Sequence, residues 1–451
     1  METEFLSLLA KQNVWWEGRI ENDVHLAQWK TRLHRWTPLE LDTLPLEPFA
    51  LNVVIGPRQA GKTTLLKFAV EKLIKTGVDP KSILYLRCDE VTSEAQLREI
   101  IESFLAFAGS KGVFIFLDEV TEVKNWAKTV KGLIDDGDLK QAAITVSGSN
   151  AFQLQKGSEL FPGRRGKGKD IYVLPLLFSE YLKVIDPDLA AKVHKLDDLT
   201  PVQIAGLKKL LPLAPELEKH LHNYLQCGGF PLSIQSFLEN GKVSEEAKET
   251  YRSWVIGDIL KNGKSDVIAR EVLKVILSKA PTPVSWEGIS QETSIKSPPT
   301  IASYIELFER LFVVLTLYAV KPGGSREFAK NKKIHLLDPL LWHLCEEWCL
   351  QKIERKTETI VEACLAVHLA RFLALKHKAK RLNDAVSYWR NGTEIDVVVH
   401  NNGLHGFEMK WSNRRQSFAF KKGPIKTTYV SKGIYLENPL TIPLPLLLAA
   451  L

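Results

Sequence analysis

A loop of nine residues at positions 56–64, GPRQAGKTT, has the residue types and the spacing that bind nucleotide phosphates. It fits the pattern G-x-x-x-x-G-K-[ST], in which glycines let backbone N–H groups turn toward the phosphates and the following helix directs its positive end at them. We expect Lys62 to contact the β- and γ-phosphates and the Thr63 hydroxyl to bind Mg²⁺. The predicted cofactor contacts cover the whole loop, namely Gly56, Pro57, Arg58, Gln59, Ala60, Gly61, Lys62, Thr63 and Thr64.

A pair of carboxylates ends the apolar segment VFIFLDEV further along the chain. Asp118 is expected to hold the Mg²⁺ through a water, and Glu119 to activate the water that attacks the γ-phosphate. A single carboxylate at a strand end often serves only as a helix N-cap. Two in succession after an apolar strand favour a catalytic site for ATP hydrolysis.

Two further polar segments are candidates for the same nucleotide site. In ITVSGSN, Ser149 or Asn150 is expected either to sense the γ-phosphate or simply to form a turn. In the basic loop PGRRGKGK, at 162–169, Arg164 or Arg165 would stabilise transition-state charge, within the subunit or from a neighbouring copy. A flexible, solvated loop is the competing interpretation of this segment.

A third constellation lies near the C-terminus, in EIDVVVH and LHGFEMK. These segments read as two strands joined by the turn-forming residues Asn401, Asn402 and Gly403. Asp396 begins the first strand, and Glu408 and Lys410 share one face of the second, which brings two carboxylates and an ammonium together across a hairpin. Carboxylates bind Mg²⁺, and a nearby Lys polarises a phosphate or orients water. The alternative is a charge pair that stabilises exposed strands.

The elements that carry these residues indicate an α/β fold. Short, continuously apolar strands alternate with helices between 51 and 148, as in a parallel sheet covered on both faces. Three helices and a strand pair follow between 267 and 320, and the pattern then returns to mixed α and β. We predict five parts: an N-terminal helical segment (1–48), a P-loop core (49–180), a helical lid (181–264), a winged helix (265–322) and an α/β domain (323–451).

The order of the motifs resembles that of a known group. The phosphate loop, the IFLDEV strand, Trp126, SGSN, the GR loop, LPLLFSEYL and GGFP are similar to those of archaeal and bacterial AAA-type ATPases with a C-terminal domain of unknown function. The resemblance covers most of the chain and implies the helical lid and the winged helix. The third helix of the winged helix, which would read DNA, is poor in cations, and this favours a packing role.

The C-terminal strands resemble the PD-(D/E)XK nuclease core. Asp396, Glu408 and Lys410 match its motif residue by residue, although Ile395 stands where that motif has Pro. The resemblance further implies that Glu362, in the preceding helix VEACLAVHL, is the acidic helix residue of that core. The predicted metal ligands are therefore Thr63 and Asp118 in the nucleotide site, and Glu362, Asp396 and Glu408 in the nuclease-like site.

Charge is distributed unevenly along the chain, which has a formal charge of +7. From residue 321 onward there are 21 Lys and Arg against 12 Asp and Glu, whereas the first 320 residues hold 39 against 41. A basic C-terminal third is typical either of a surface for nucleic acid, with DNA favoured, or of a solubilising surface rich in Lys.

The cysteines and the N-terminus indicate a cytoplasmic protein. The five cysteines are scattered, and METEFLSLL lacks the pattern of a signal peptide. We expect no membrane segment and allow for a homo-oligomer. Two functions follow from these residues: an ATPase that uses ATP and Mg²⁺ to act on nucleic acid, or an ATP-dependent switch whose nuclease-like domain binds without cutting.

Overall fold

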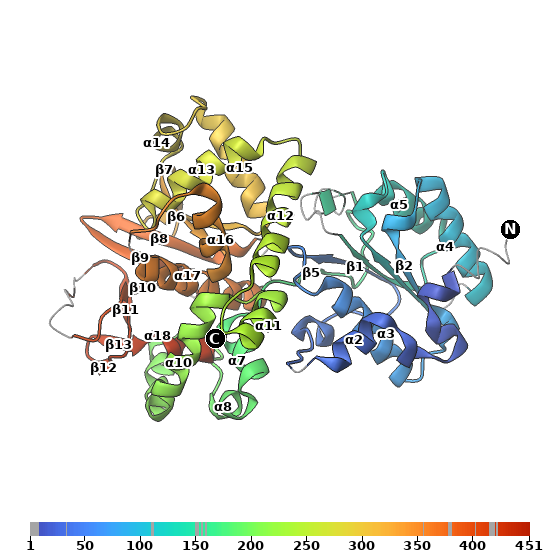
Figure 1. Ribbon diagram of the computed structural model, residues 1–451, viewed down its shortest axis with the longest axis horizontal. Helices are drawn as coiled ribbons and strands as arrows, with labels where there is room; N and C mark the ends of the chain where they lie inside the picture. Colours follow the sequence, from blue (N-terminus) through green and yellow to red (C-terminus); the bar gives the residue numbers. More distant parts are fainter. Residues whose placement is uncertain are drawn as a thin grey trace. The chain divides into compact units, whose positions relative to one another are not determined.

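The computed structural model divides the chain into two compact units, Met1–Leu174 (unit 1) and Pro175–Leu451 (unit 2). Figure 1 shows unit 1 in blue to cyan and unit 2 in green to red. The residues that the structure describes are 9–32, 34–109, 112–148, 153–154, 157, 160–354, 356–377, 381–401, 403–414, 420 and 423–451.

Unit 1 is built on a five-stranded parallel sheet with the order β2-β3-β4-β1-β5. The four longer strands are almost wholly buried, because helices cover both faces of the sheet. The predicted parallel α/β core is confirmed. Its strands are β1 (Ala50–Ile55), β2 (Ile83–Arg87), β3 (Val113–Asp118), β4 (Ala142–Ser147) and β5 (Asp170–Tyr172).

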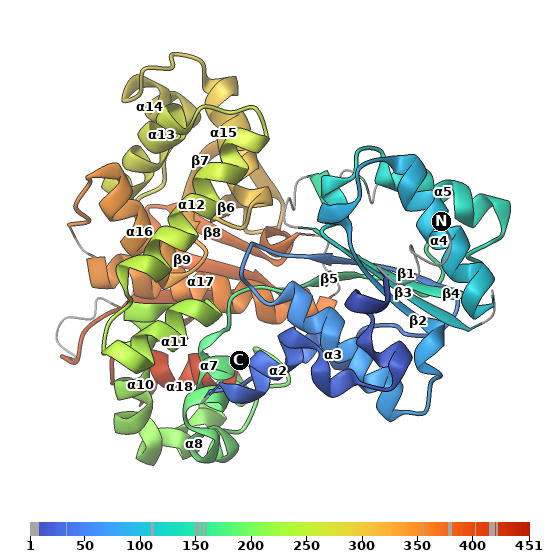
Figure 2. The same ribbon diagram turned by 45° about the vertical axis from the view of Figure 1, so that its right-hand side comes forward.

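Three long helices cover this sheet. Helix α3 lies on one face, and α4 and α5 lie on the other (Figures 1 and 2). Each of these helices has an apolar side that packs inward, and Ser93 caps α4 by accepting a hydrogen bond from the Gln96 N–H. The bounds are α3 (Lys62–Lys75), α4 (Glu94–Ala108) and α5 (Trp126–Asp136).

The N-terminal segment consists of α2 (Val24–Thr31) and the short 3-10 turns η1 (Val14–Glu17), η2 (Ile20–Asn22) and η3 (Leu39–Asp42). Its Trp15 and Leu44 belong to the same apolar core as α3 and strands β1 to β3. The indole N–H groups of Trp15 and Trp16 both donate to the carbonyl oxygen of Ile83, at 3.1 and 2.8 Å. This segment is therefore an integral part of the core of unit 1 and supports β2 directly.

Unit 2 contains an eight-stranded mixed sheet with the order β12-β13-β11-β10-β9-β8-β6-β7. Helix α17 packs against β7, β8 and β9 of this sheet. The strands are β6 (Val314–Val320), β7 (Arg326–Leu336), β8 (Val386–Asn391), β9 (Thr393–His400), β10 (Leu404–Lys410), β11 (Lys426–Ser431), β12 (Leu436–Glu437) and β13 (Leu440–Pro443).

Two groups of helices lie at opposite ends of the sheet of unit 2 in both views (Figures 1 and 2). At one end lie α13 (Asp266–Lys279), α14 (Trp286–Gln291) and α15 (Pro298–Arg310). At the other lie α7 (Phe178–Ile185), α8 (Pro187–Lys192), α10 (Ala214–Cys227) and α18 (Leu444–Ala450). The remaining helices are α9 (Pro201–Gly206), α11 (Pro231–Asn240), α12 (Glu245–Lys261), α16 (Pro339–Cys349) and α17 (Lys356–His377).

Three helices followed by the antiparallel pair β6–β7 occur in the order predicted for the winged helix. The strand β6 also pairs with β8 in parallel, at Ala319 and Tyr388, so the pair is continuous with the C-terminal sheet. The predicted boundary at residue 322 lies in the turn between β6 and β7. Division of unit 2 into a winged helix and a separate α/β domain remains a prediction.

Candidate functional site

The phosphate loop connects the buried strand β1 to helix α3, as the sequence predicts. Two glycines are required by its geometry. A Cβ at Gly56 would lie 1.9 Å from the carbonyl oxygen of Val173, and Gly61 has a φ of 106°. Between them, Pro57 and Ala60 are buried, Arg58 is half-buried and Gln59 is exposed. A side chain at 56 would therefore collide with the chain at Val173, and one at 61 would be strained by the left-handed backbone.

Lys62 is the first residue of α3 and is buried. Its ammonium donates to the carbonyl oxygens of Gly56 and Pro57, at 3.0 and 2.8 Å. These bonds hold the positive charge inside the loop at the N-terminal end of a helix. Both the ammonium and the helix end attract an anion at this point.

Asp118, the last residue of β3, accepts hydrogen bonds from three hydroxyl groups. The Thr63 Oγ1 and Tyr85 Oη atoms lie 2.7 and 2.8 Å from its Oδ2, and the Ser147 hydroxyl donates to Oδ1. The predicted pair Thr63 and Asp118 is thus brought together, although the two residues lie far apart in sequence. An oxygen-only set of hydroxyl and carboxylate is the donor chemistry that Mg²⁺ prefers.

Ser147 and Tyr85 were not among the residues selected from the sequence. Their roles follow from the strand order, since β3 lies between β2, which carries Tyr85, and β4, which ends beside Asp118. Ser147 is the final residue of β4 and is fully buried. The predicted sensor residues Ser149 and Asn150 lie outside the described residues. In the sequence, Ser147 could have been recognised as a hydroxyl residue that ends an apolar strand.

Tyr85 is held in place by the N-terminal segment. The Asn13 side chain donates to the Tyr85 carbonyl at 2.9 Å and accepts from the Tyr85 N–H at 2.7 Å. The Lys67 ammonium lies 3.5 Å from the centre of the Tyr85 ring and forms a buried ion pair with Asp23 at 2.9 Å. The hydrogen bonds between Asn13 and the Tyr85 backbone, together with the cation–π contact from Lys67, thus direct the Tyr85 hydroxyl toward Asp118.

The other predicted residues of the nucleotide site have distinct surroundings. Glu119 follows Asp118 directly and has a left-handed backbone with a φ of 55°. The Thr64 hydroxyl lies 2.9 Å from the Nε2 atom of His25. The Arg164 side chain is 36% exposed, and its guanidinium pairs with Asp135 of α5 at 2.6 Å. The arginine is therefore held on the surface of unit 1 through an exposed ion pair.

The predicted nuclease-like residues lie on the antiparallel pair β9–β10, which confirms the predicted strand pairing. Asp396 Oδ2 accepts a hydrogen bond from the Met409 N–H at 2.8 Å. On β10, the Lys410 ammonium lies 2.5 Å from Glu408 Oε1. The register of the two strands places Asp396 opposite Glu408 when it is continued by one step. The carboxylates of these two residues therefore belong to one face of the sheet.

Lys333 of β7 occupies the centre of this acidic cluster, and the sequence did not single it out. Its ammonium lies 2.8 Å from Glu362 Oε1, 2.7 Å from Glu394 Oε1 and 2.8 Å from Asp396 Oδ1. Burial, and then the charge of Asp396, raise the pKa of Glu362 to about 8. Burial alone would lower the pKa of Lys333, but the three carboxylates outweigh it and raise that pKa. No local motif pointed to Lys333, because β7 is distant from β9 in sequence.

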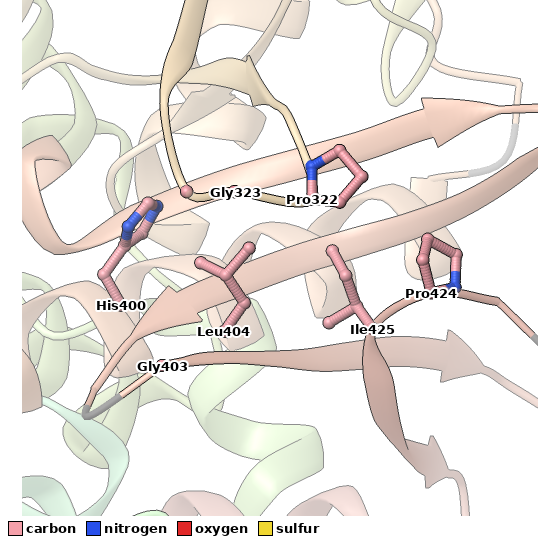
Figure 3. A pocket seen from close by; sticks show the side chains of 8 residues that line it. Pro322, Gly323, His400, Gly403, Leu404, Pro424 and Ile425 are labelled. Atoms are coloured by element: carbon pink, nitrogen blue, oxygen red, sulfur yellow. The ribbon is translucent and has the colours of Figure 1, made fainter.

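An open pocket of about 590 Å³ lies elsewhere in unit 2 (Figure 3). Pro322 and Gly323 lie on one side of it, and Leu404 and Ile425 on the other. His400 is its titratable side chain, and burial, together with Arg326, lowers the pKa of this residue. None of the predicted site residues lines the pocket, whose walls are completed by Gly324, Gly403 and Pro424.

The cysteines and the acidic side chains are the remaining candidates for metal ligands. All five cysteines are buried and free of disulfides, as expected for core thiols. Within the described ranges, no three His, Cys, Asp or Glu side chains are grouped so that they could hold a metal ion. The same ranges contain no helix whose length and apolar character would let it span a membrane.

Comparison with known proteins supports the assignment of the core. Residues 49–182 match a family described as an AAA domain, and residues 218–348 match one described as a domain of unknown function. An uncharacterized protein of Methanocaldococcus jannaschii is 25% identical over 79% of this chain and 73% of its own length. A second uncharacterized protein, from Haemophilus influenzae, is 23% identical over 64% of this chain and 67% of its own length.

Among solved structures, a Walker-type ATPase of Pyrococcus abyssi is similar. It is 13% identical, with a TM-score of 0.41, over 66% of this chain and 91% of its own length. Independently of that structure, the parallel strand order of unit 1 and its phosphate loop agree with the match to the AAA domain model. Residues 49–182 therefore form an AAA-type P-loop ATPase-like fold.

Proposed function

We propose that this chain is a Mg²⁺-dependent ATPase in which ATP hydrolysis by unit 1 is coupled to nucleic-acid binding by unit 2. The observation that carries the proposal is the 2.7 Å contact between Thr63 and Asp118. It joins the phosphate loop to the acidic strand at one end of a parallel sheet. Ligands of open α/β sheets bind at that end of the strands.

The residues of unit 1 fit ATP and Mg²⁺. Backbone N–H groups of the loop and the N-terminal end of α3 would bind the phosphates, and Lys62 would leave its carbonyl partners to contact them. Thr63 and Asp118 would hold Mg²⁺, which when bound neutralises phosphate charge. Ser147 and Tyr85 orient Asp118 by hydrogen bonds to both of its carboxylate oxygens.

Glu119 is the group that would accept a proton from the attacking water. It stands next to Asp118, and its left-handed backbone turns the chain sharply at the end of β3. A carboxylate at this point would be within reach of a water beside the γ-phosphate of bound ATP. Ser149 would sense the γ-phosphate, and Arg164, from this copy or from a neighbour in a homo-oligomer, would stabilise transition-state charge.

Nucleic-acid binding is assigned to unit 2 because of its charge. The chain from residue 321 onward has 21 basic against 12 acidic residues. Such an excess attracts a polyanion, and DNA is the favoured partner. The alternative function is a switch in which ATP binding alone changes the conformation. The presence of Glu119, which can accept a proton from the attacking water, favours hydrolysis over such a switch.

The test compares ATP turnover by wild type, Glu119→Gln and the surface control Lys75→Ala, with and without duplex DNA. Glu119→Gln keeps the shape of the side chain and removes the base, so it should bind ATP and lose turnover. Lys75 is exposed at the end of α3, and its variant should behave as wild type. Unchanged turnover in Glu119→Gln would remove Glu119 from catalysis, and absence of turnover in wild type would favour the switch.

A further inference from the structure

The ammonium of Lys333 is enclosed by carboxylates from two elements that are remote from it in sequence. Glu362 comes from α17, and Glu394 and Asp396 come from β9. Each of the three contributes an oxygen at 2.7 or 2.8 Å from the Lys333 Nζ atom. An ammonium has three N–H donors, so one donor is available for each carboxylate.

This ammonium is sealed from solvent. The Lys333 side chain is 1% exposed and Glu362 is 8% exposed. A buried charge is stable only where opposite charges and hydrogen bonds compensate it, and three carboxylates supply that compensation here. Because its head group does not reach the surface, Lys333 is not placed to contact a substrate. It holds β7 to α17 and β9.

The predicted metal ligands of unit 2 are all engaged by lysines. Glu362 and Asp396 bind Lys333, and Glu408 binds Lys410 at 2.5 Å. The second carboxylate oxygen of Asp396 accepts a hydrogen bond from the Met409 N–H. A Mg²⁺ ion requires oxygen ligands at about 2.0–2.1 Å in near-octahedral geometry. It would compete with Lys333 for the same oxygens and be repelled by its charge, so these residues do not fit a divalent metal.

We propose that the Lys333 ammonium is the resident cation of the cluster formed by Glu362, Glu394 and Asp396, in the place that the sequence motif assigns to Mg²⁺. Unit 2 therefore binds no divalent ion between Asp396 and Glu408, and its nuclease-like strands do not support metal-dependent cleavage of nucleic acid. The inference concerns the cluster itself and is independent of ATP hydrolysis in unit 1.

The test is a titration of the nucleotide-free full chain with Mn²⁺, in which unbound Mn²⁺ is measured by electron paramagnetic resonance. Wild type and Asp396→Asn should bind equal amounts of Mn²⁺, because Asp396 holds an ammonium and no metal. Lys333→Met, which removes the charge and retains the length, should bind one additional Mn²⁺ per chain. The double variant Lys333→Met/Asp396→Asn should lose that ion again. Lys330→Met alters an exposed lysine on the same strand and should match wild type.

A stoichiometric Mn²⁺ that wild type binds and Asp396→Asn loses would overturn the proposal, as would a Lys333→Met variant that folds and gains no ion. If Lys333→Met fails to fold, the comparison of wild type with Asp396→Asn decides alone. A melting temperature of wild type that is equal in EDTA and in Mn²⁺ would support the resident ammonium, and a Mn²⁺-dependent rise that Asp396→Asn abolishes would oppose it. Omitting nucleotide keeps failure here distinct from failure of the ATPase proposal.

Discussion

The carboxylate of Asp118 illustrates how one side chain depends on residues that are scattered along the sequence. Three hydroxyl groups donate to it, from α3, β2 and β4. A hydrogen bond to a charged group contributes about 1.5–3 kcal/mol, so each donor is able to fix the orientation of the carboxylate. The N-terminal segment takes part indirectly, since its Asn13 holds the Tyr85 backbone and its Asp23 pairs with Lys67, whose ammonium lies over the Tyr85 ring.

Tyr85→Phe should lower ATP turnover by the proposed ATPase when Mg²⁺ is scarce. Loss of one hydroxyl leaves Asp118 less well oriented, and we expect ATP turnover to fall by about tenfold or more at low Mg²⁺. Steady-state hydrolysis at several Mg²⁺ concentrations measures the effect. The control Tyr435→Phe removes a hydroxyl in unit 2, and turnover of Tyr85→Phe equal to that of this control would show that the hydroxyl has no positioning role.

Arg164 offers a second test at the same scale. Its pairing with Asp135 is exposed, and solvent screening leaves such pairs little effect on stability. If the guanidinium stabilises transition-state charge, Arg164→Ala should lower turnover by about a thousandfold while ATP binding is retained. The matched variant Asp135→Ala breaks the same ion pair and should keep turnover. If the two variants change ATP turnover equally, Arg164 has only a structural role.

At the scale of elements, Asp338 joins two segments of unit 2. It caps α16, and its two oxygens accept from the N–H groups of Leu340 and Gly229, both at 2.8 Å. Burial raises the pKa of Asp338 to about 7. The usual value for an unfolded chain is about 3.9, so the folded state holds this proton more tightly than the unfolded state. Asp338 therefore stabilises the fold most below about pH 4.

This difference predicts how stability changes with pH. The contribution of Asp338 should be lost as the pH rises from about 4 to 7, with a magnitude of the order of 4 kcal/mol. Asp338→Asn cannot ionise, so its urea midpoint should vary less than that of wild type over this range. Asp197→Asn, at an exposed position, is the control. Parallel pH profiles for wild type and Asp338→Asn would contradict the assignment.

The sequence predicted elements and local motifs well, because both depend on neighbouring residues. The alternation of apolar strands and helices indicated the parallel sheet, and the loop from Gly56 to Thr64 indicated a phosphate site. The sequence did not predict the site roles of Lys333, Ser147 and Tyr85, and the reason is physical. Their partners come from strands and helices that only the tertiary fold brings near, so no spacing in the sequence marks them.

At the scale of the whole molecule, charge should decide where nucleic acid binds. Contact with phosphates releases counterions, so affinity for duplex DNA should fall with rising salt, with a slope near −0.9 per contacted phosphate. Fluorescence anisotropy of labelled oligonucleotides at several salt concentrations measures this slope. The fragment Pro175–Leu451 should retain most of the affinity, and Met1–Leu174 little of it. Salt-dependent binding by the second fragment alone would contradict the assignment to unit 2.

The continuity of β6 and β7 with the C-terminal sheet bears on how such a chain evolves. A boundary at residue 322 would cut a strand pair whose partners run from Val314–Leu336 to Val320–Arg326. Recombination at that point would separate two hydrogen-bonded strands and leave each with an unpaired edge. We therefore expect a viable gene fusion to exchange the three helices and the nuclease-like strands of unit 2 as one module, and not to divide the chain at residue 322.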